Sequence, residues 1–215
     1  MNATPTLIIA DDHPLVRDGL LEHFTSDQGF NVLGTANNAQ QAVLMCREHH
    51  PDVLLLDVEM PGRDSLGAMT DIKSASPDTR IILLTAFCRD PIIQIALRSG
   101  IAGYLLKSDQ IPDIKKAVLR SLRGERVYSK DVQARIALTQ SHDSSNANTL
   151  LSTLHPRELE VLRYIGKGLS NSEMAPIMHI SIRTVERHVL RLMRDLKIDD
   201  RTKLTVLAHQ SGLVN

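Results

Sequence analysis

The first 125 residues alternate short apolar runs with longer amphipathic stretches. Two of the runs, Val53–Leu56 and Ile81–Leu84, are apolar throughout. Such runs are typical of strands that are buried on both faces of a parallel sheet. The five predicted strands are Leu7–Ala10, Asn31–Thr35, Val53–Asp57, Ile81–Thr85 and Ala102–Leu106.

The stretches between these runs have the residue spacing of amphipathic helices. In Pro14–Thr25 we expect one buried face made of Leu15, Leu20, Leu21 and Phe24. The other predicted helices are Ala39–His49, Ser65–Ala75, Pro91–Ser99 and Ile111–Leu122. Five strand–helix units in succession predict a doubly wound α/β domain over residues 1–125, with a five-stranded parallel sheet and right-handed crossovers.

A different pattern follows residue 125. Ser129–Leu138 predicts one more helix, and Thr139–Thr149 is rich in Ser and Asn, which is the composition of a linker. We therefore expect a linker helix and a flexible linker over residues 126–149. Residues 150–215 contain no strand-like run and predict an all-α domain of four helices, with Ser170 and Ser181 as N-caps and Gly168 as a C-cap.

Composition and charge narrow the class of protein. Hydrophobic residues make up 42% of the 215, which is enough for packed cores. No run approaches the ~18 apolar residues of a membrane helix, and Met1–Thr6 lacks the features of a signal peptide, so we expect a cytoplasmic protein without a membrane partner. Cys46 and Cys88 are expected to be free thiols. Residues 150–215 carry 10 Lys+Arg against 7 Asp+Glu and the remainder 15 against 18, as expected for two domains with different partners.

Polar side chains gather where the predicted strands end. Asp11 and Asp12 follow the first strand, Asp57 ends the third, Thr85 ends the fourth and Lys107 follows the fifth. The carboxyl ends of parallel strands share one edge, where ligands bind at the point at which the strand order reverses, so these side chains should converge. Three carboxylates repel one another, and such a cluster needs a cation; oxygen ligands favour Mg²⁺.

This set predicts phosphoryl chemistry. Asp57 would be the nucleophile that forms an aspartyl phosphate, Lys107 would supply a point charge and Thr85 a hydroxyl for the phosphoryl oxygens. The alternative is structural: Asp11 or Asp12, which precede His13 and Pro14, would simply cap the first helix.

Four segments resemble the receiver domain of two-component response regulators. They are Ala-Asp11-Asp12-His-Pro, Leu-Leu-Leu-Asp57-Val-Glu-Met-Pro61, Leu-Leu-Thr85-Ala and Gly-Tyr104-Leu-Leu-Lys107. The resemblance implies a flavodoxin-like fold and a sensor histidine kinase that phosphorylates Asp57. It also implies that Asp12, Asp57 and the backbone carbonyl of Glu59 hold Mg²⁺, with Asp11 acting through water.

The same resemblance implies a switch made of Thr85 and Tyr104, in which the hydroxyl moves onto the phosphate and the ring turns inward. The sequence alone favours the alternative, in which Tyr104 is a half-buried strand residue. One departure is Ser108, which stands where many receivers have a proline with a cis bond. This departure leaves the conformation of the loop open.

A helix with an arginine face is predicted near the C-terminus. Over Ser181–Lys197, one stripe is apolar and consists of Ile182, Val185, Val189, Leu192 and Leu196. Arg183, Arg187, Arg191 and Arg194 lie on the opposite side. An apolar seam backed by arginines suits a helix that packs on its domain and enters a DNA groove, whereas an ordinary solvated face would mix charges of both signs.

The preceding Ser170–Met178 helix and the turn His179–Ser181 complete a helix-turn-helix. The motifs around Glu158, Asn171, Glu173, Thr184 and His188 resemble the LuxR-type four-helix output domain, and the whole chain resembles a NarL/FixJ-family response regulator. We expect double-stranded promoter DNA to contact Arg183, Thr184, Arg187, His188, Arg191 and Arg194. The resemblance implies a homodimer on DNA through the Arg201–Gly212 helix; its apolar Leu204, Leu207 and Ala208 could alternatively pack inside their own domain.

Four residues depart from the LuxR-type pattern. His155 stands where Thr or Ser is usual, which predicts a weaker N-cap. Pro176 lies inside a predicted helix, where it costs ~3 kcal/mol if the helix stays regular, so we expect a kink or a shortened helix. Glu186 and Leu190 stand where relatives often carry lysine; they could read a cytosine N4 and a thymine methyl, or contact nothing.

The sequence therefore predicts a transcription factor in which phosphorylation of Asp57 alters dimerisation or domain release, and so DNA binding. It is not expected to be an enzyme. One alternative is a regulator that works through protein contacts without phosphate. The other is a phosphatase with an aspartyl nucleophile and Glu59 as its general acid.

Overall fold

A computed structural model describes residues 4–26, 29–62, 64–141, 151 and 154–214 of the chain. In the described part, six parallel strands form one sheet in the order β2-β1-β3-β4-β5-β6. The strands are β1 (Thr6–Ala10), β2 (Asn31–Ala36), β3 (Val53–Asp57), β4 (Arg80–Thr85), β5 (Gly103–Leu106) and β6 (Val127–Tyr128). The doubly wound parallel sheet is confirmed, with one more strand than predicted.

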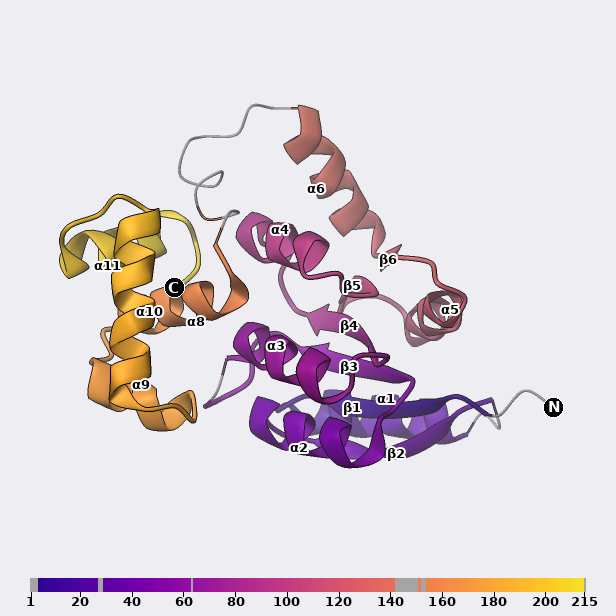
Figure 1. The fold of residues 1–215 in the computed structure, drawn as a ribbon. Helices are drawn as coiled ribbons and strands as arrows, with labels where there is room; N and C mark the ends of the chain where they lie inside the picture. Colours follow the sequence, from indigo (N-terminus) through magenta and orange to yellow (C-terminus); the bar gives the residue numbers. More distant parts are fainter. Residues whose placement is uncertain (1–3, 27–28, 63, 142–150, 152–153, 215) are drawn as a thin grey trace.

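Helices cover both faces of this sheet (Figure 1). They are α1 (Pro14–Thr25), α2 (Ala39–His49), α3 (Ser65–Ala75), α4 (Asp90–Arg98) and α5 (Ile111–Leu122). Successive strand residues point to opposite faces: Leu55 belongs to the core under α1 and α5, whereas Leu54 and Leu56 belong to the core under α2, α3 and α4. Burial on both faces explains why these strands are apolar throughout.

The buried face of α1 differs from the prediction. Leu20 and Phe24 are buried, and Phe24 makes an edge-to-face contact with Phe30 at 5.0 Å between ring centroids. Leu15, however, is 87% exposed. Leu15 and Leu20 are five positions apart, which is about 140° around a helix, so one face cannot bury both.

After β6, helix α6 (Lys130–Ser141) runs beside α4 (Figure 1). The Arg135 guanidinium pairs with the Asp90 carboxylate at 2.5 Å between Nε and Oδ1. The predicted linker Thr139–Thr149 therefore begins as helix, and its residues 142–149 lie outside the described part of the chain. Cys46 and Cys88 are free thiols.

The C-terminal unit is helical, as predicted. It contains α8 (Pro156–Gly166), α9 (Asn171–Ile177), α10 (Ile182–Asp195) and α11 (Arg201–Gln210). Ser170 and Ser181 cap α9 and α10, and Gly168 follows α8 with a φ of +80°. His155 caps α8 through its ring, with Glu158 completing a capping box. α9 is short and ends one residue after Pro176, in agreement with the expected shortening.

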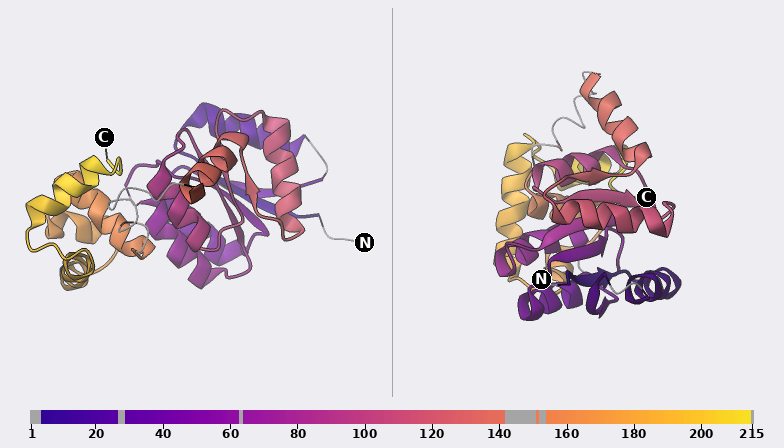
Figure 2. Two further views of the ribbon diagram at one scale, coloured as in Figure 1. Left: turned by 90° about the horizontal axis from the view of Figure 1, so that it is seen from above. Right: turned by 90° about the vertical axis from the view of Figure 1, so that its right-hand side faces the viewer.

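The two units meet where α8 packs against α3 (Figures 1 and 2). α8 lies between the sheet domain and α10, so α10 reaches the rest of the molecule mainly through α8 and α9. Among the described residues, no helix has both the length and the apolar character that crossing a membrane requires.

Candidate functional site

The predicted acidic cluster forms at the carboxyl ends of β1 and β3. These strands are neighbours, with Ala10 in register with Leu56, and the strand order reverses between them. Asp11 and Asp57 are therefore brought together, and each is only 1% exposed. Ligand atoms of Asp11, Asp12, His13 and Asp57 all lie within 4.8 Å of one another, a donor set that could hold a metal ion.

His13 was not expected in this cluster. Its Nδ1 lies 2.8 Å from Asp12 Oδ1, and its backbone N–H donates to Asp11 Oδ1 at 2.9 Å. His13 itself occupies the N-cap position of α1, so the alternative in which Asp11 or Asp12 caps that helix is wrong.

Lys107 ties the two buried carboxylates together. Its Nζ lies 2.7 Å from Asp11 Oδ2 and 2.8 Å from Asp57 Oδ2. Burial works to lower the pKa of Lys107, but its hydrogen bonds to both carboxylates outweigh burial and leave that pKa above its ordinary value. Burial also raises the pKa of Asp57, against the opposing effects of Lys107 and the Glu59 N–H. One cation faces two buried carboxylates, which leaves excess negative charge for a metal ion to neutralise.

The segment between β3 and α3 borders this site. The Glu59 backbone N–H donates to Asp57 Oδ1 at 3.0 Å, which holds the backbone of Glu59 beside the carboxylate. The Glu59 side chain pairs with Arg89 at 3.2 Å, and Arg89 also lies 5.0 Å from the centroid of the Phe87 ring. Arg89 was not among the predicted site residues.

Thr85 and Tyr104 are linked through the loop after β4. The Phe87 N–H donates to Thr85 Oγ1 at 3.3 Å, and the Tyr104 hydroxyl donates to the Phe87 carbonyl at 2.9 Å. The Tyr104 ring is fully buried, so the half-buried alternative is wrong. Burial raises the pKa of Tyr104 far above its ordinary value and keeps its hydroxyl protonated. No peptide bond among the described residues is cis, and so the backbone around Ser108 is trans.

The helix-turn-helix forms as predicted. His179, with a φ of +53°, makes the turn that ends α9, and α10 follows. Val185, Val189 and Leu192 are buried on the inner face of α10. Ile182, which we expected in the apolar stripe, is half exposed at the first turn.

The predicted DNA-facing residues divide into two groups. Arg183 and Arg187 are exposed and have no ion pair among the residues that the structure describes. Arg191 pairs with the buried Glu158 at 2.7 Å, and Arg194 pairs with Asp195 at 3.0 Å. The sequence could not reveal the pairing of Arg191 with Glu158, because Glu158 lies on another helix.

Thr184 and His188, the other two predicted DNA contacts, are partly buried. The hydroxyls of Thr184 and Ser181 lie 2.9 Å apart at the start of α10. Burial, and then the charge of Arg187, lower the pKa of His188, so its ring is neutral near pH 7 and able both to donate and to accept hydrogen bonds.

The apolar stripe on α11 is used inside its own domain. Leu204 and Ala208 are fully buried, and Ala208 packs against Gly166 of α8. The exposed apolar side chain of α11 is Val206. A dimer contact through α11 would therefore use the exposed Val206 and not the buried Leu204 and Ala208.

The geometry defines a class: a receiver-like sheet domain with a carboxylate–lysine site, joined to a helix-turn-helix domain. Residues 7–119 match the response regulator receiver domain, and residues 152–208 match the bacterial regulatory proteins of the luxR family. The chain belongs to the two-component response regulators with a LuxR-type DNA-binding domain.

Relatives match along nearly the whole chain. The response regulator protein VraR of Staphylococcus epidermidis is 32% identical over 208 residues, which are 97% of this chain and 98% of VraR. The structure of RcsB from Salmonella enterica serovar Typhimurium, bound to promoter rprA in the presence of the phosphomimetic BeF3-, is 26% identical with a TM-score of 0.67, over 95% of this chain and 98% of that chain. A LuxR-family response regulator from Aurantimonas is 28% identical with a TM-score of 0.61, over 65% of this chain and 100% of that one.

Proposed function

We propose that this chain is a transcriptional regulator controlled by phosphorylation of Asp57, with a receiver over residues 1–125, a linker over 126–149 and an output domain over 150–215. The observation that carries the proposal is the placement of Lys107 Nζ between the buried carboxylates of Asp11 and Asp57. A buried nucleophile beside a fixed cation is arranged for phosphoryl transfer, in which positioning and charge supply most of the catalysis.

Asp57 would accept the phosphoryl group from a phosphohistidine of a sensor kinase. A carboxylate oxygen of Asp57 attacks phosphorus, the P–N bond breaks and the histidine nitrogen leaves with the bonding pair. Lys107 and the Thr85 hydroxyl would bind phosphoryl oxygens. Tyr104 would respond through the loop at Phe87, to which both Thr85 and Tyr104 are hydrogen-bonded.

The oxygen ligands of the acidic cluster fit Mg²⁺. Asp11, Asp12, Asp57 and the backbone carbonyl of Glu59 would hold the ion, which when bound neutralises charge on the incoming phosphoryl group. The Glu59 carboxylate is engaged by Arg89. This pairing disfavours Glu59 as the general acid of a phosphatase, and so favours a regulator over an enzyme.

The output domain would bind double-stranded promoter DNA as a dimer, with α10 in the major groove. Arg183, Thr184, Arg187, His188, Arg191 and Arg194 are the proposed contacts. The exposed arginines on α10 support this assignment, as do the solved RcsB structures, which include complexes with promoter DNA. Phosphorylation would alter dimerisation or domain release in the cytoplasm, where kinase and DNA meet.

The test measures phosphorylation and DNA affinity together. Wild type and Asp57→Ala are incubated with Mg²⁺ and acetyl phosphate, or without the donor, and their affinities are measured for duplexes that wild type selects from a random-sequence library. We expect one phosphoryl group on wild type, seen in the intact mass, and tighter DNA binding, with neither in Asp57→Ala. Equal affinity in all four samples contradicts the phosphoswitch. Unchanged output in Asp57→Glu favours the phosphate-independent alternative, and turnover of phosphate esters favours the phosphatase.

A further inference from the structure

A buried ion pair joins the two domains at the start of α3. Arg163 of α8 lies with Nη1 2.8 Å from Asp64 Oδ2, and both side chains are less than 10% exposed. Asp64 also caps α3, because its Oδ1 accepts from the Leu66 N–H at 2.8 Å. A charge that is buried at a domain boundary is costly unless its partner stays in place. This pair therefore favours one fixed arrangement of the two domains.

The Tyr164 hydroxyl of α8 is hydrogen-bonded to backbone groups that follow β3, the strand that ends at Asp57. It accepts from the Asp64 N–H at 2.6 Å and donates to the Gly62 carbonyl at 3.1 Å. Burial raises the pKa of Tyr164 well above its ordinary value, so the hydroxyl keeps the proton that it donates. α8 thereby contacts Gly62 and Asp64, which follow Glu59 in the connection between β3 and α3.

A third contact requires a glycine on α3. A Cβ on Gly67 would lie 1.8 Å from Glu160 Oε2 and 2.2 Å from Glu160 Cδ, so α8 seats directly on the backbone of α3. Arg157 then bridges the domains by pairing with Glu160 of its own helix at 2.8 Å and with Asp71 of α3. The contact has the close fit of a specific docking surface.

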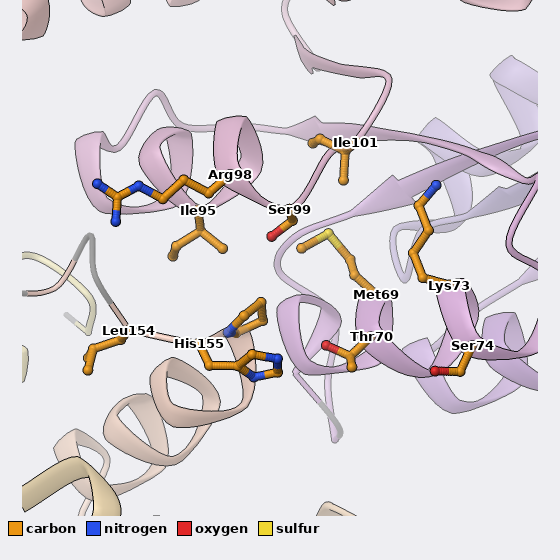
Figure 3. Close-up of a pocket in the computed structure, with 11 residues that line it drawn as sticks. Met69, Thr70, Lys73, Ser74, Ile95, Arg98, Ser99, Ile101, Leu154 and His155 are labelled. Carbon is orange, nitrogen blue, oxygen red and sulfur yellow. The ribbon is translucent and has the colours of Figure 1, made fainter. Parts of the chain in front are cut away.

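Beside this contact the domains are less tightly packed. A cavity of about 520 Å³ lies between α3, α4 and the start of α8, and Met69, Ile95, Ile101 and His155 are among its lining residues (Figure 3). The docking therefore depends on the line of α8–α3 contacts from Asp64 to Asp71, and a single well-placed change there should undo it.

Docking leaves the arginines of the proposed DNA-binding set exposed. α8 separates α3 from α10 (Figure 1), and Arg183 and Arg187 are exposed while α8 is docked. Val206 of α11 is exposed as well, and the Tyr104 ring is already buried. Neither the arginine face nor the burial of Tyr104 requires the domains to separate.

We propose that the chain binds DNA in this docked form, with α3, Gly62 and Asp64 as a positioning surface that holds α8, and through it α10, in a fixed orientation. This inference rests on the proposed DNA-binding function and selects dimerisation over domain release. A dimer with rigid arms meets a two-fold DNA site with its reading helices already oriented, whereas output domains on flexible tethers lose orientational freedom when they bind.

The test breaks docking from the receiver side and leaves the DNA-binding face untouched. In full-length Gly67→Leu the new side chain overlaps Glu160. In the double variant, Glu160→Ala removes the side chain that the new leucine at position 67 overlaps. Glu160→Ala alone is the matched control. Hydrogen exchange of the α8 amides reports undocking, and phosphorylation by acetyl phosphate reports that the receiver is folded.

We expect Gly67→Leu to exchange faster in α8, to accept phosphate normally and to bind the selected duplex about tenfold more weakly, a change of about 1.4 kcal/mol. The double variant should recover the affinity of Glu160→Ala. Equal or tighter DNA binding by an undocked Gly67→Leu overturns the proposal, as does a Gly67→Leu whose α8 stays protected. Failure of wild type to bind duplex DNA, or equal binding by Arg183→Ala with Arg187→Ala, would instead overturn the proposed function.

Discussion

At the scale of single residues, the central feature is Asp57, an ionised carboxylate buried beside a second one. Asp57→Asn removes this charge and keeps the shape of the side chain, while Asp11 retains its pair with Lys107. We expect the variant to be more stable than wild type at pH 7 without divalent ions, by roughly 1 kcal/mol, because the cost of burying a charge disappears. Urea denaturation measures the difference.

The pH dependence of that gain follows from the direction of the pKa shift. The pKa of Asp57 is raised above its ordinary 3.8 in the folded state. Between pH 3.8 and this raised pKa, folded wild type therefore binds more protons than the unfolded chain, and wild type loses stability as pH rises across that range. The advantage of Asp57→Asn should therefore be full at pH 7 and shrink as pH falls toward 4. The exposed Asp18→Asn is the control, and an advantage that does not change with pH would refute this explanation.

The convergence of Asp11, Asp57 and Lys107 could be predicted, because each ends a strand and parallel strands align their ends. His13 and Arg89 could not, since loop backbone directs them into the site. The pairing of Arg191 with Glu158 was equally hidden, because it depends on how two helices cross.

At the scale of elements, Pro176 shapes the first helix of the helix-turn-helix. It lies on the exposed side of α9, lacks the N–H that would bond to the Ser172 carbonyl, and precedes the turn at His179. Pro176→Ala restores that donor, and we expect the output domain to gain about 1–3 kcal/mol of unfolding free energy. Hydrogen exchange in α9 would measure the gain, and Gln210→Ala, a change at an exposed position of α11, serves as the control. Unchanged or faster exchange in Pro176→Ala would show that the proline is already accommodated by the short helix.

The elements themselves were largely predictable from periodicity, with instructive exceptions. β6 has two residues, too few for a period-two pattern to be visible, and it is defined by pairing Val127 with Gly103. The sequence correctly showed that α11 has an apolar stripe, but it could not show which helix this stripe packs against. Packing of Ala208 on Gly166 depends on tertiary geometry that a helix pattern does not contain.

At the scale of the whole molecule, the sequence indicated two domains but not how they fit. The contact of Gly67 with Glu160 joins residues far apart in the chain, and each is unremarkable in its own segment. Charge asymmetry was a weak clue to two domains with different partners. The structure adds that two of the α10 arginines, Arg183 and Arg187, are exposed without ion pairs among the described residues, whereas Arg191 and Arg194 are paired within their own domain.

This division predicts how DNA binding should depend on salt. Each phosphate contact that a protein makes releases counterions, so log K falls with log[salt] by about 0.9 per contact. Arg183→Ala and Arg187→Ala should each lower the steepness of this dependence by about one contact per subunit. The exposed Lys116 of the receiver offers a matched control, because Lys116→Ala removes the same charge far from α10. Affinities measured from 50 to 200 mM salt would test the assignment: if Lys116→Ala flattens the slope as much as Arg187→Ala, net charge and not the arginine face of α10 governs the binding.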